Sequence, residues 1–476
     1  MAFIPGTAST ISIAGSKGNP YYVFLLTLVA TLGGLLFGYD TAVISGAVDS
    51  LKMFFHLDEA TYGSAATFYH GATVSSALIG CIIGGVLSGI LATKLGRRIS
   101  LLVAAVLFIV ASLGAAYPES LFFKNSSSVT VLFLFNFYRI IGGIGVGLAS
   151  AICPMYIAEI APANIRGKLV SWNQFAIIFG MLVVYFVNYF IAKGQSQQWI
   201  DHTGWRLMFL SNAYPAVIFC ILLFFVPETP RYLVLTGNED KSLDVLSRIN
   251  GKEAALAILK EIKETIHEKA EKVSAFGWKV LAIGILLSVF QQVVGINVVL
   301  YYAPTIFKGL GFGNDAAMYQ TVIMGFVNIV FTLVAIFTVD KFGRKPLLII
   351  GSFGMAVGMF AIGSLAYFKL IGFSTLVFIV IYSASFMMSW GPICWVLISE
   401  IFPNAVRSKA IAIAVASQWI ANFVVSATFP SLEAFSLPFT YCLYGVMSIL
   451  SAWFVWKMVP ETKGKTLEQI EHTWKN

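Results

Sequence analysis

The sequence predicts an all-α polytopic membrane protein whose twelve transmembrane helices form two six-helix bundles of the same sense. The first observation is composition: of 476 residues, 58% are hydrophobic and only 11% are charged, and the mean hydropathy is +0.83. Because a soluble chain carries about 25% charged residues, this composition argues against a soluble protein. The second observation is a set of twelve apolar runs of spanning length. The third is that the two halves of the chain repeat the same motifs in the same order.

The predicted spans are defined by length, since a helix needs about 20 mostly apolar residues to cross the hydrocarbon core. The 41 glycines fit this class, because glycine lets transmembrane helices approach closely. In chain order the spans are 21–48, 70–93, 99–117, 130–152, 169–192, 207–226, 280–303, 316–339, 346–368, 370–399, 410–432 and 434–456.

Positive charge predicts the orientation of these spans. With the N-terminus inside, 24 of the 31 Lys and Arg residues fall in cytoplasmic segments, six fall outside, and Arg139 lies in the fourth span. The positive-inside rule therefore predicts that both termini are cytoplasmic. The net charge of +8 reflects the topology and attracts anionic lipid. Because these two roles account for it, we expect no nucleic-acid partner.

A charged interval divides the chain after the sixth span. Leu256, Leu259 and Ile266 recur within it at near-helical spacing, which favours a few short amphipathic helices over the alternative of a flexible linker. The predicted units are a cytoplasmic N-terminal segment at 1–20, a six-helix bundle at 21–227, a helical linker at 228–279, a second bundle at 280–458 and a cytoplasmic tail at 459–476.

Three pairs of motifs carry the repeat. The first pair is LATKLGRRISLL (91–102) with TVDKFGRKPLLI (338–349), the second is AEIAPANIRGK (158–168) with SEIFPNAVRSK (399–409), and the third is VPETPRYL (226–233) with VPETKGKTL (459–467). Two bundles repeated in this way predict a binding site between them, near the middle of the bilayer.

Residue chemistry argues against an enzyme and against a bound cofactor or metal. We find no phosphate-binding loop, no HExxH-type motif and no convincing nucleophile–base pair in the sequence. The five cysteines lie in or beside apolar runs without metal-ligand spacing, so we interpret them as small packing residues.

Asp40 in the first span and Arg139 in the fourth are the two formal charges that we find in the apolar cores. A charge at the bilayer centre costs about 2.5–3.5 kcal/mol on insertion scales, so such residues usually have a partner or a task. One interpretation is a structural ion pair that orients two helices. The other is a carboxylate that takes up and releases a proton as its access to Arg139 and to water changes.

Several motifs resemble those of the sugar porter family of the major facilitator superfamily. They are the GRR and GRK turns, PMYIAEIAP followed by RG, VPETPRYL, QQVVGIN, WGPICWVLISEIFP and VPETKG, and the similarity runs from about Tyr22 to Glu468. The resemblance implies the major facilitator fold and the import, by alternating access, of a neutral monosaccharide (D-xylose or a glucose-like hexose) together with a proton. Proton-coupled members carry aspartate at the position of Asp40, whereas passive facilitators carry asparagine. The alternatives are a passive sugar facilitator of the same fold and a sugar-sensing receptor.

Carboxamides in the spans suit the neutral hydroxyls of a sugar, because each amide both donates and accepts hydrogen bonds. On a straight helix Gln292 and Asn297 would lie about 140° apart. They converge only if the seventh span is broken between them, and Gly295 is placed to permit that break. Taken alone, Asn328 and Asn422 favour a role in hydrogen bonding between helices.

The family pattern also implies a sugar site and a gate above it. Trp395 and Trp419 lie inside spans, whereas belt tryptophans lie at the interfaces, and core packing is the alternative for Trp419. Tyr301 and Tyr302 correspond to an aromatic extracellular gate, with an interfacial tyrosine pair as the alternative. The implied sugar contacts are Gln174, Gln291, Gln292, Asn297, Trp395 and Gln418, with Phe37, Asn328 and Trp419 as further candidates.

Acids and bases at the inner helix ends repeat between the halves and predict a cytoplasmic gate that opens easily, because exposed ion pairs are individually weak. We expect cross-half pairs of Glu159 with Arg407 and of Glu400 with Arg166; solvated or topogenic charges are the alternative. The full set is Arg97, Glu159, Arg166 and Glu228 in the first half and Arg344, Glu400 and Arg407 in the second.

Asn212 in the sixth span is a departure, since a proton-coupled member of the family carries glutamate there. If that acid relays protons, this chain uses Asp40 alone or relays differently. We expect the chain to work as a monomer in a bacterial inner membrane, with a monosaccharide, the proton and the lipid bilayer as its partners.

Overall fold

The structure is a computed structural model that describes residues 18–120, 128–162, 165–265, 278–309, 311, 313–370, 372–402 and 407–463. These residues form helices joined by short turns, and no strand occurs among them. Twelve helical segments are long and apolar enough to cross a membrane. The predicted number of spans is therefore confirmed.

The helices of the first half are α1 (Pro20–Ala42), η1 (Val43–Gly46), α2 (Val48–Phe54), α3 (Glu59–Tyr62), η2 (Gly63–Ala65), α4 (Ala66–Lys94), α5 (Arg97–Ala116), α6 (Ser128–Ile160), α7 (Arg166–Ala192), α8 (Gln197–Trp199), η3 (Ile200–Gly204), α9 (Trp205–Ser211) and α10 (Ala213–Leu223). The linker contains α11 (Pro230–Leu235), α12 (Glu239–Asn250) and α13 (Lys252–Thr265). The second half contains α14 (Trp278–Val293), α15 (Ile296–Tyr301), α16 (Ala303–Gly309), α17 (Asn314–Phe342), α18 (Arg344–Tyr367), α19 (Phe373–Met387), α20 (Trp390–Ile401), α21 (Arg407–Phe435) and α22 (Leu437–Met458).

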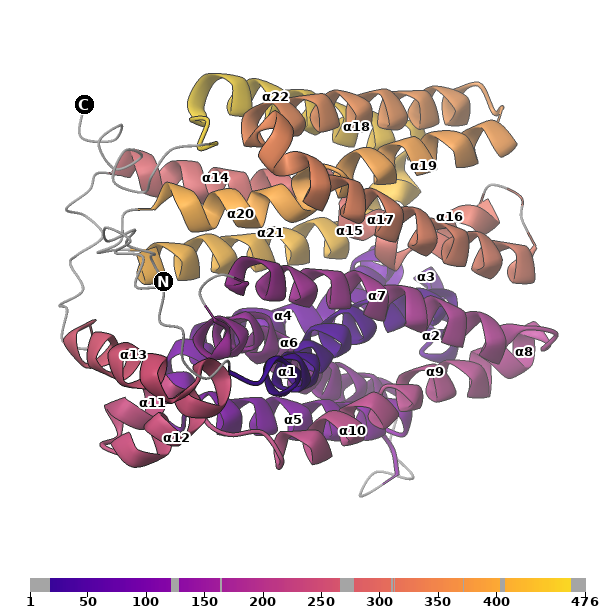
Figure 1. Ribbon diagram of the computed structural model, residues 1–476. Coiled ribbons are helices and arrows are strands. Elements are labelled where there is room, and N and C mark those ends of the chain that lie inside the picture. The colour runs from indigo at the N-terminus through magenta and orange to yellow at the C-terminus, as the bar shows by residue number, and fades with distance from the viewer. Residues whose placement is uncertain are drawn as a thin grey trace.

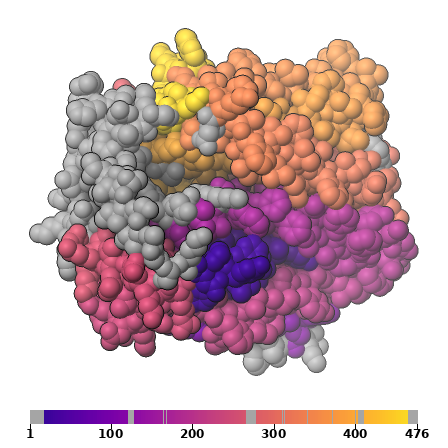
Figure 2. Space-filling model, viewed as in Figure 1, coloured from indigo at the N-terminus to yellow at the C-terminus, as the bar shows by residue number. Residues whose placement is uncertain are grey.

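The two halves lie side by side, with the linker helices at one end of the first half (Figure 1). Helix α4 packs on α21, and α7 packs on α17, so these two helix pairs join the halves. In the space-filling view the halves meet along a seam (Figure 2). The twelve spans therefore form two groups that meet at these contacts.

Two glycine–arginine turns mark one end of the bundle, which we call the basic end. Gly96 and Gly343 have φ of 90° and 93°, a conformation that side chains disfavour. A Cβ on Gly96 would lie 2.3 Å from the Glu228 carboxylate, and one on Gly343 would lie 2.8 Å from the Glu461 carboxylate. The sequence repeat is thus also a structural repeat. We call the opposite end, which carries α2 and α16, the far end.

Three spans are broken near the middle of the molecule. The predicted break in the seventh span is confirmed, because α14 ends at Val293 and Gly295 adopts the left-handed conformation, with φ of 92°, before α15 begins. The sixth span breaks at Asn212, where Pro215 has no N–H to continue the helix. The tenth breaks between α19 and α20, which we did not predict.

Helices α1 and α7 approach so closely that their backbones touch. A Cβ on Gly38 would lie 1.9 Å from the Ile177 carbonyl oxygen, and one on Gly180 would lie 2.1 Å from the Leu35 carbonyl oxygen. Glycine on both helices permits this spacing, as is common between transmembrane helices. The contact fixes α1 beside the cavity described below.

Candidate functional site

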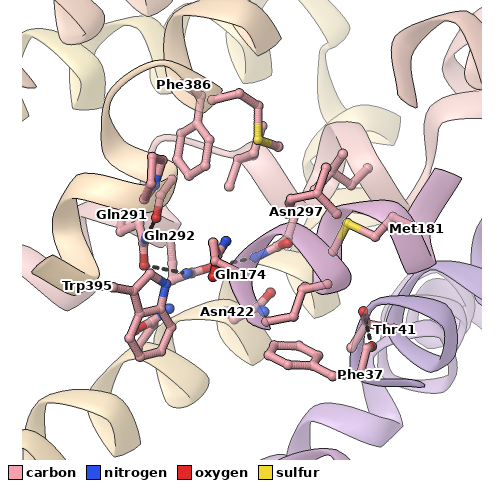
Figure 3. A pocket seen from close by; sticks show the side chains of 18 of the residues that line it. Phe37, Thr41, Gln174, Met181, Gln291, Gln292, Asn297, Phe386, Trp395 and Asn422 are labelled. Carbon is pink, nitrogen blue, oxygen red and sulfur yellow. Dashed lines mark hydrogen bonds between the residues drawn. The ribbon is translucent and has the colours of Figure 1, made fainter. Parts of the chain in front are cut away.

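A cavity of about 700 Å³, including its open mouth, lies between the two halves. Helices α1 and α7 supply one wall, and α14, α15, α17, α19, α20 and α21 supply the other (Figure 3). The site therefore lies where the repeat predicts it.

Most of the predicted sugar-site residues line this cavity. Among the described residues that line it, none is charged, so the walls suit a neutral polar ligand. Phe37 on α1 and Trp395 on α20 lie on opposite sides, with Gln174 of α7 between them (Figure 3). The predicted residues that line the cavity are Phe37, Gln174, Gln291, Gln292, Asn297, Tyr301, Trp395, Gln418 and Trp419.

The break at Gly295 brings the amides of the seventh span together. The Asn297 side chain donates to Gln292 Oε1, and Gln292 Nε2 donates to Gln291 Oε1 at 3.4 Å. Gln291 Nε2 in turn donates to the main-chain oxygens of Trp390 and Gly391 at 2.9 and 3.2 Å. One chain of hydrogen bonds thus links the breaks of the seventh and tenth spans and orients the amides at the cavity wall.

Three buried polar atoms on the cavity wall have no hydrogen-bond partner within the described part of the chain. They are Gln418 Oε1, Trp419 Nε1 and Thr332 Oγ1, which together provide acceptors and donors. Buried polar groups are nearly always hydrogen-bonded in folded proteins. A ligand that carries several hydroxyls, or water in its absence, would satisfy all three.

Two predicted site residues are placed elsewhere. Asn328 is not among the residues that line the cavity; it is buried and accepts a hydrogen bond from Ser383 Oγ at 2.6 Å, while Thr332, one turn along α17, lines the wall. Tyr302 also lies outside the lining, packs on Phe429 at a ring distance of 4.8 Å and donates to the Ser426 oxygen at 3.1 Å. Asn328 therefore has the interhelical role, and Tyr302 contacts α21 rather than the cavity.

Sequence reasoning also missed part of the wall. Thr41, Met181, Phe386 and Thr332 line the cavity without a distinctive motif. Thr41 follows Phe37 by one helical turn, so helical spacing from Phe37 could have found it. Asn422, which we interpreted as an interhelical residue, both lines the cavity and donates to the Tyr301 hydroxyl at 3.4 Å.

Asp40 and Arg139 meet on the face of α1 that turns away from the cavity. Both residues are buried, and Arg139 Nη1 lies 3.3 Å from Asp40 Oδ2. The guanidinium group also contacts the Asp40 main-chain oxygen at 3.4 Å and lies 5.2 Å above the Phe209 ring. The predicted partners are therefore brought together, and α1 carries this pair beside Phe37 and Thr41 of the cavity wall.

At the basic end, the ion pairs described by the structure lie within each half. Arg97 pairs with Glu159 at 2.8 Å, and Arg344 pairs with Glu400 at 3.0 Å. Glu159 and Glu400 each pair with the arginine that follows the glycine turn of their own half, and the cross-half pairs stay a prediction. The Arg407 side chain lies outside the described residues, and Arg166 Nε donates to the Ala161 oxygen at 3.3 Å.

Glu228 and Glu461 hold the first turns of α5 and α18. Glu228 accepts from the backbone N–H groups of Arg97 and Arg98 at 3.1 and 3.0 Å, and Glu461 accepts from those of Arg344 and Lys345 at 3.1 and 2.9 Å. Burial raises the pKa of Glu228, although backbone hydrogen bonds oppose this. Burial also raises the pKa of Glu461, but its backbone hydrogen bonds outweigh burial and leave that pKa lowered. Glu461 was missed, although the VPET repeat pairs it with Glu228.

Comparison with known proteins agrees with these features. The profile of the family "Sugar (and other) transporter" matches residues 26–474. The chain is 53% identical over 473 residues to the D-xylose-proton symporter of Escherichia coli (strain K12), covering 96% of each chain. It is 39% identical to the glucose facilitated diffusion protein of Zymomonas mobilis, covering 97% of this chain and 99% of that protein.

A solved structure shows the same fold. The inward open conformation of the xylose transporter XylE from E. coli matches with a TM-score of 0.85 at 52% sequence identity, covering 95% of this chain and 100% of that one. The family profile spans nearly the whole chain, and the structural match covers both six-helix bundles. The chain therefore belongs to the sugar (and other) transporter family and has the major facilitator fold.

Proposed function

We propose that this protein is a proton-coupled symporter that imports a neutral monosaccharide, D-xylose or a glucose-like hexose, by alternating access. The observation that carries the proposal is the position of α1. Phe37 and Thr41 on this helix line an uncharged cavity, whereas Asp40 on the same helix bonds to Arg139. A shift of α1 that tightens the wall around a sugar would therefore also change the surroundings of the carboxylate.

The cavity supports the substrate class. Its lining amides offer both donors and acceptors, which a polyhydroxylated neutral molecule requires, and so do the atoms of Gln418, Trp419 and Thr332 that have no partner in the described part of the chain. Phe37 and Trp419 lie with ring centroids 5.7 Å apart and provide an aromatic surface for the C–H face of a pyranose. The E. coli relative is named for D-xylose and the proton, which agrees with this assignment.

The orientation is part of the proposal. We place the basic end in the cytoplasm, because most of the Lys and Arg residues outside the spans lie at that end. Labelling of intact cells with a membrane-impermeant maleimide tests this placement. A cysteine introduced at exposed Glu59 of the far end should react, and one at exposed Glu253 of α13 should react only after the membrane is opened; the reverse pattern would contradict the placement.

Transport by the purified protein in liposomes tests the function. Uptake of D-xylose, D-glucose, D-galactose and L-arabinose is measured with and without an imposed proton gradient. We expect the gradient to drive accumulation of at least one sugar, and Asp40→Asn to allow equilibration without accumulation. Asp58→Asn, which changes an exposed acid at the far end, is the matched control and should still accumulate sugar.

The passive facilitator is the second candidate, and the 39% identity to a glucose facilitated diffusion protein is the observation that favours it. In that case wild type would equilibrate sugar but never concentrate it, and Asp40→Asn would behave like wild type. A receptor would bind sugar in the cavity but move none under either condition.

A further inference from the structure

The carboxylate of Asp40 has a second partner that is uncharged. Asn212 Nδ2 donates to Asp40 Oδ1 at 3.0 Å, which is shorter than the 3.3 Å contact of Arg139 with Oδ2. Next to Asp40, the Tyr39 hydroxyl lies 2.7 Å from Ser211 Oγ, the residue before Asn212. Two consecutive residues of α1 are therefore bonded to two consecutive residues of the sixth span.

Asn212 occupies a special place in that span. It stands in the break between α9 and α10, where Pro215 interrupts the helix, and it is only 1% exposed. Its own Oδ1 is buried and has no partner among the described residues. The amide thus donates to the carboxylate through Nδ2, while its Oδ1 can still accept a hydrogen bond.

We infer that Asn212 is a positioning residue that sets the acidity at which Asp40 binds and releases its proton. While Asp40 is charged, the amide donates to it. When a proton from water binds the carboxylate, the amide can turn so that Oδ1 accepts the new O–H; the proton later returns to water, and Asn212 itself never gains or loses one. That Asp40 binds a proton does not depend on the proposed function; only the use of this proton to drive transport rests on it.

The direction of the effect follows from the two hydrogen bonds. A hydrogen bond to a charged acceptor is roughly twice as strong as one between neutral groups. The amide therefore stabilises charged Asp40 more than neutral Asp40, and its loss should favour the protonated form. Among the described residues, the titratable groups that interact electrostatically with Asp40 are Arg139 of α6, Cys81 of α4 and Tyr301 of α15, and all three stay constant in the comparison below.

The test compares Asn212→Val with Asn212→Thr, two side chains of similar shape, of which only threonine can donate and accept. The purified protein in lipid is titrated while the C=O stretching band of protonated carboxyls is followed by infrared difference spectroscopy. The Asp40 band is identified by its loss in Asp40→Asn. We expect its midpoint to lie about one pH unit higher in the valine variant than in the threonine variant, or about 1.4 kcal/mol.

A matched control is Asn188, which is also 1% exposed, donates to the Val43 oxygen at 3.2 Å and has an Oδ1 without a partner in the described residues. Asn188→Val and Asn188→Thr should show the same Asp40 midpoint. Equal midpoints for the two Asn212 variants would overturn the inference. If valine prevents folding, Asn212→Ala against Asn212→Ser repeats the comparison with a smaller pair.

The infrared titration requires no transport, so it separates this inference from the proposed function. A protein that shows the expected midpoint shift but transports no sugar would contradict only the function. Where D-xylose is transported, the pH profile of gradient-driven uptake should move by the same amount, while sugar exchange without a gradient keeps its rate. A loss of uptake without any movement of the pH profile would indicate a merely structural role and overturn the inference.

Discussion

Asp49 of α2 joins the two halves at the far end. It accepts hydrogen bonds from Thr305 Oγ1 at 3.0 Å and from Lys308 Nζ at 2.9 Å, both on α16. The side chains of Lys308 and Asp49 are 26% and 33% exposed, so the ion pair is neither buried nor fully solvated. We predict that Asp49→Ala shifts the protein toward a conformation that is open at the far end.

The magnitude follows from the two contacts that are lost. Partly exposed ion pairs contribute about 0.2–1 kcal/mol, and a hydrogen bond contributes about 0.5–1.5 kcal/mol net. Their sum is of the order of 1.4 kcal/mol, which corresponds to about a tenfold change in the ratio of the two conformations. A stronger effect would require burial that these side chains do not have.

Spin labels on cysteines introduced at Glu59 and Lys369, exposed residues of the two halves at the far end, report the opening as a distance distribution. Cys220 and Cys442 are partly exposed and are first replaced by serine, so that the label does not attach to them; the other three cysteines are buried. The long-distance population should rise in Asp49→Ala and in Lys308→Ala, and the double variant should add little to either. Asp58→Ala, an exposed acid at the same end that bonds only within α3, is the control. A distribution in Asp49→Ala identical to that in the control would refute the reasoning.

Two further comparisons test the cavity wall. Gly295→Ala should lower the thermal unfolding midpoint more than Gly311→Ala. Both positions have positive φ, which costs an alanine about 1–2 kcal/mol. Only at Gly295 would the added Cβ also meet the Tyr444 ring, at 2.9 Å. Equal losses in a thermal-shift assay would contradict this. Gln291→Leu should destabilise the sugar-free protein by about 1–3 kcal/mol, because it removes two hydrogen bonds, to the Trp390 and Gly391 oxygens, each of which contributes about 0.5–1.5 kcal/mol. Gln418→Leu, which removes an acceptor that has no partner among the described residues, should preserve its stability and weaken only sugar binding, measured by equilibrium binding on the same samples.

Much of the fold was predictable because the bilayer leaves few options. Every span must satisfy its backbone internally and present an apolar surface, so length and hydropathy sufficed to find all twelve. The break at Gly295 was predictable because Gln292 and Asn297 could not otherwise converge. The break before Trp390 was missed because nothing in its apolar run demanded convergence, although Pro392 lies close after it.

The polar residues of the site were predictable, because burying a polar group costs free energy. The apolar residues that define the shape of the cavity were not. Asp40, Arg139 and most of the amides stand out in the sequence because burying them requires a partner. Met181 and Phe386 resemble any other lipid-facing or core residue in the sequence, and only packing reveals that they line the cavity. For Asn328, residue chemistry favoured hydrogen bonding between helices, whereas the family pattern made it a candidate for the sugar site. The sequence could not decide between these roles, because a buried amide that bonds to Ser383 has the same sequence signal as one that faces a ligand.

The backbone contact between α1 and α7 has a mechanical consequence. Gly38 and Gly180 leave room for the partner backbone and for nothing larger, so sliding α1 along α7 would bring a side chain into that contact. Helices α1 and α7 are therefore coupled and should move as one unit. Phe37 and Thr41 of the cavity wall and the carboxylate of Asp40 all belong to this unit, so a displacement that the sugar favours also changes the surroundings of Asp40.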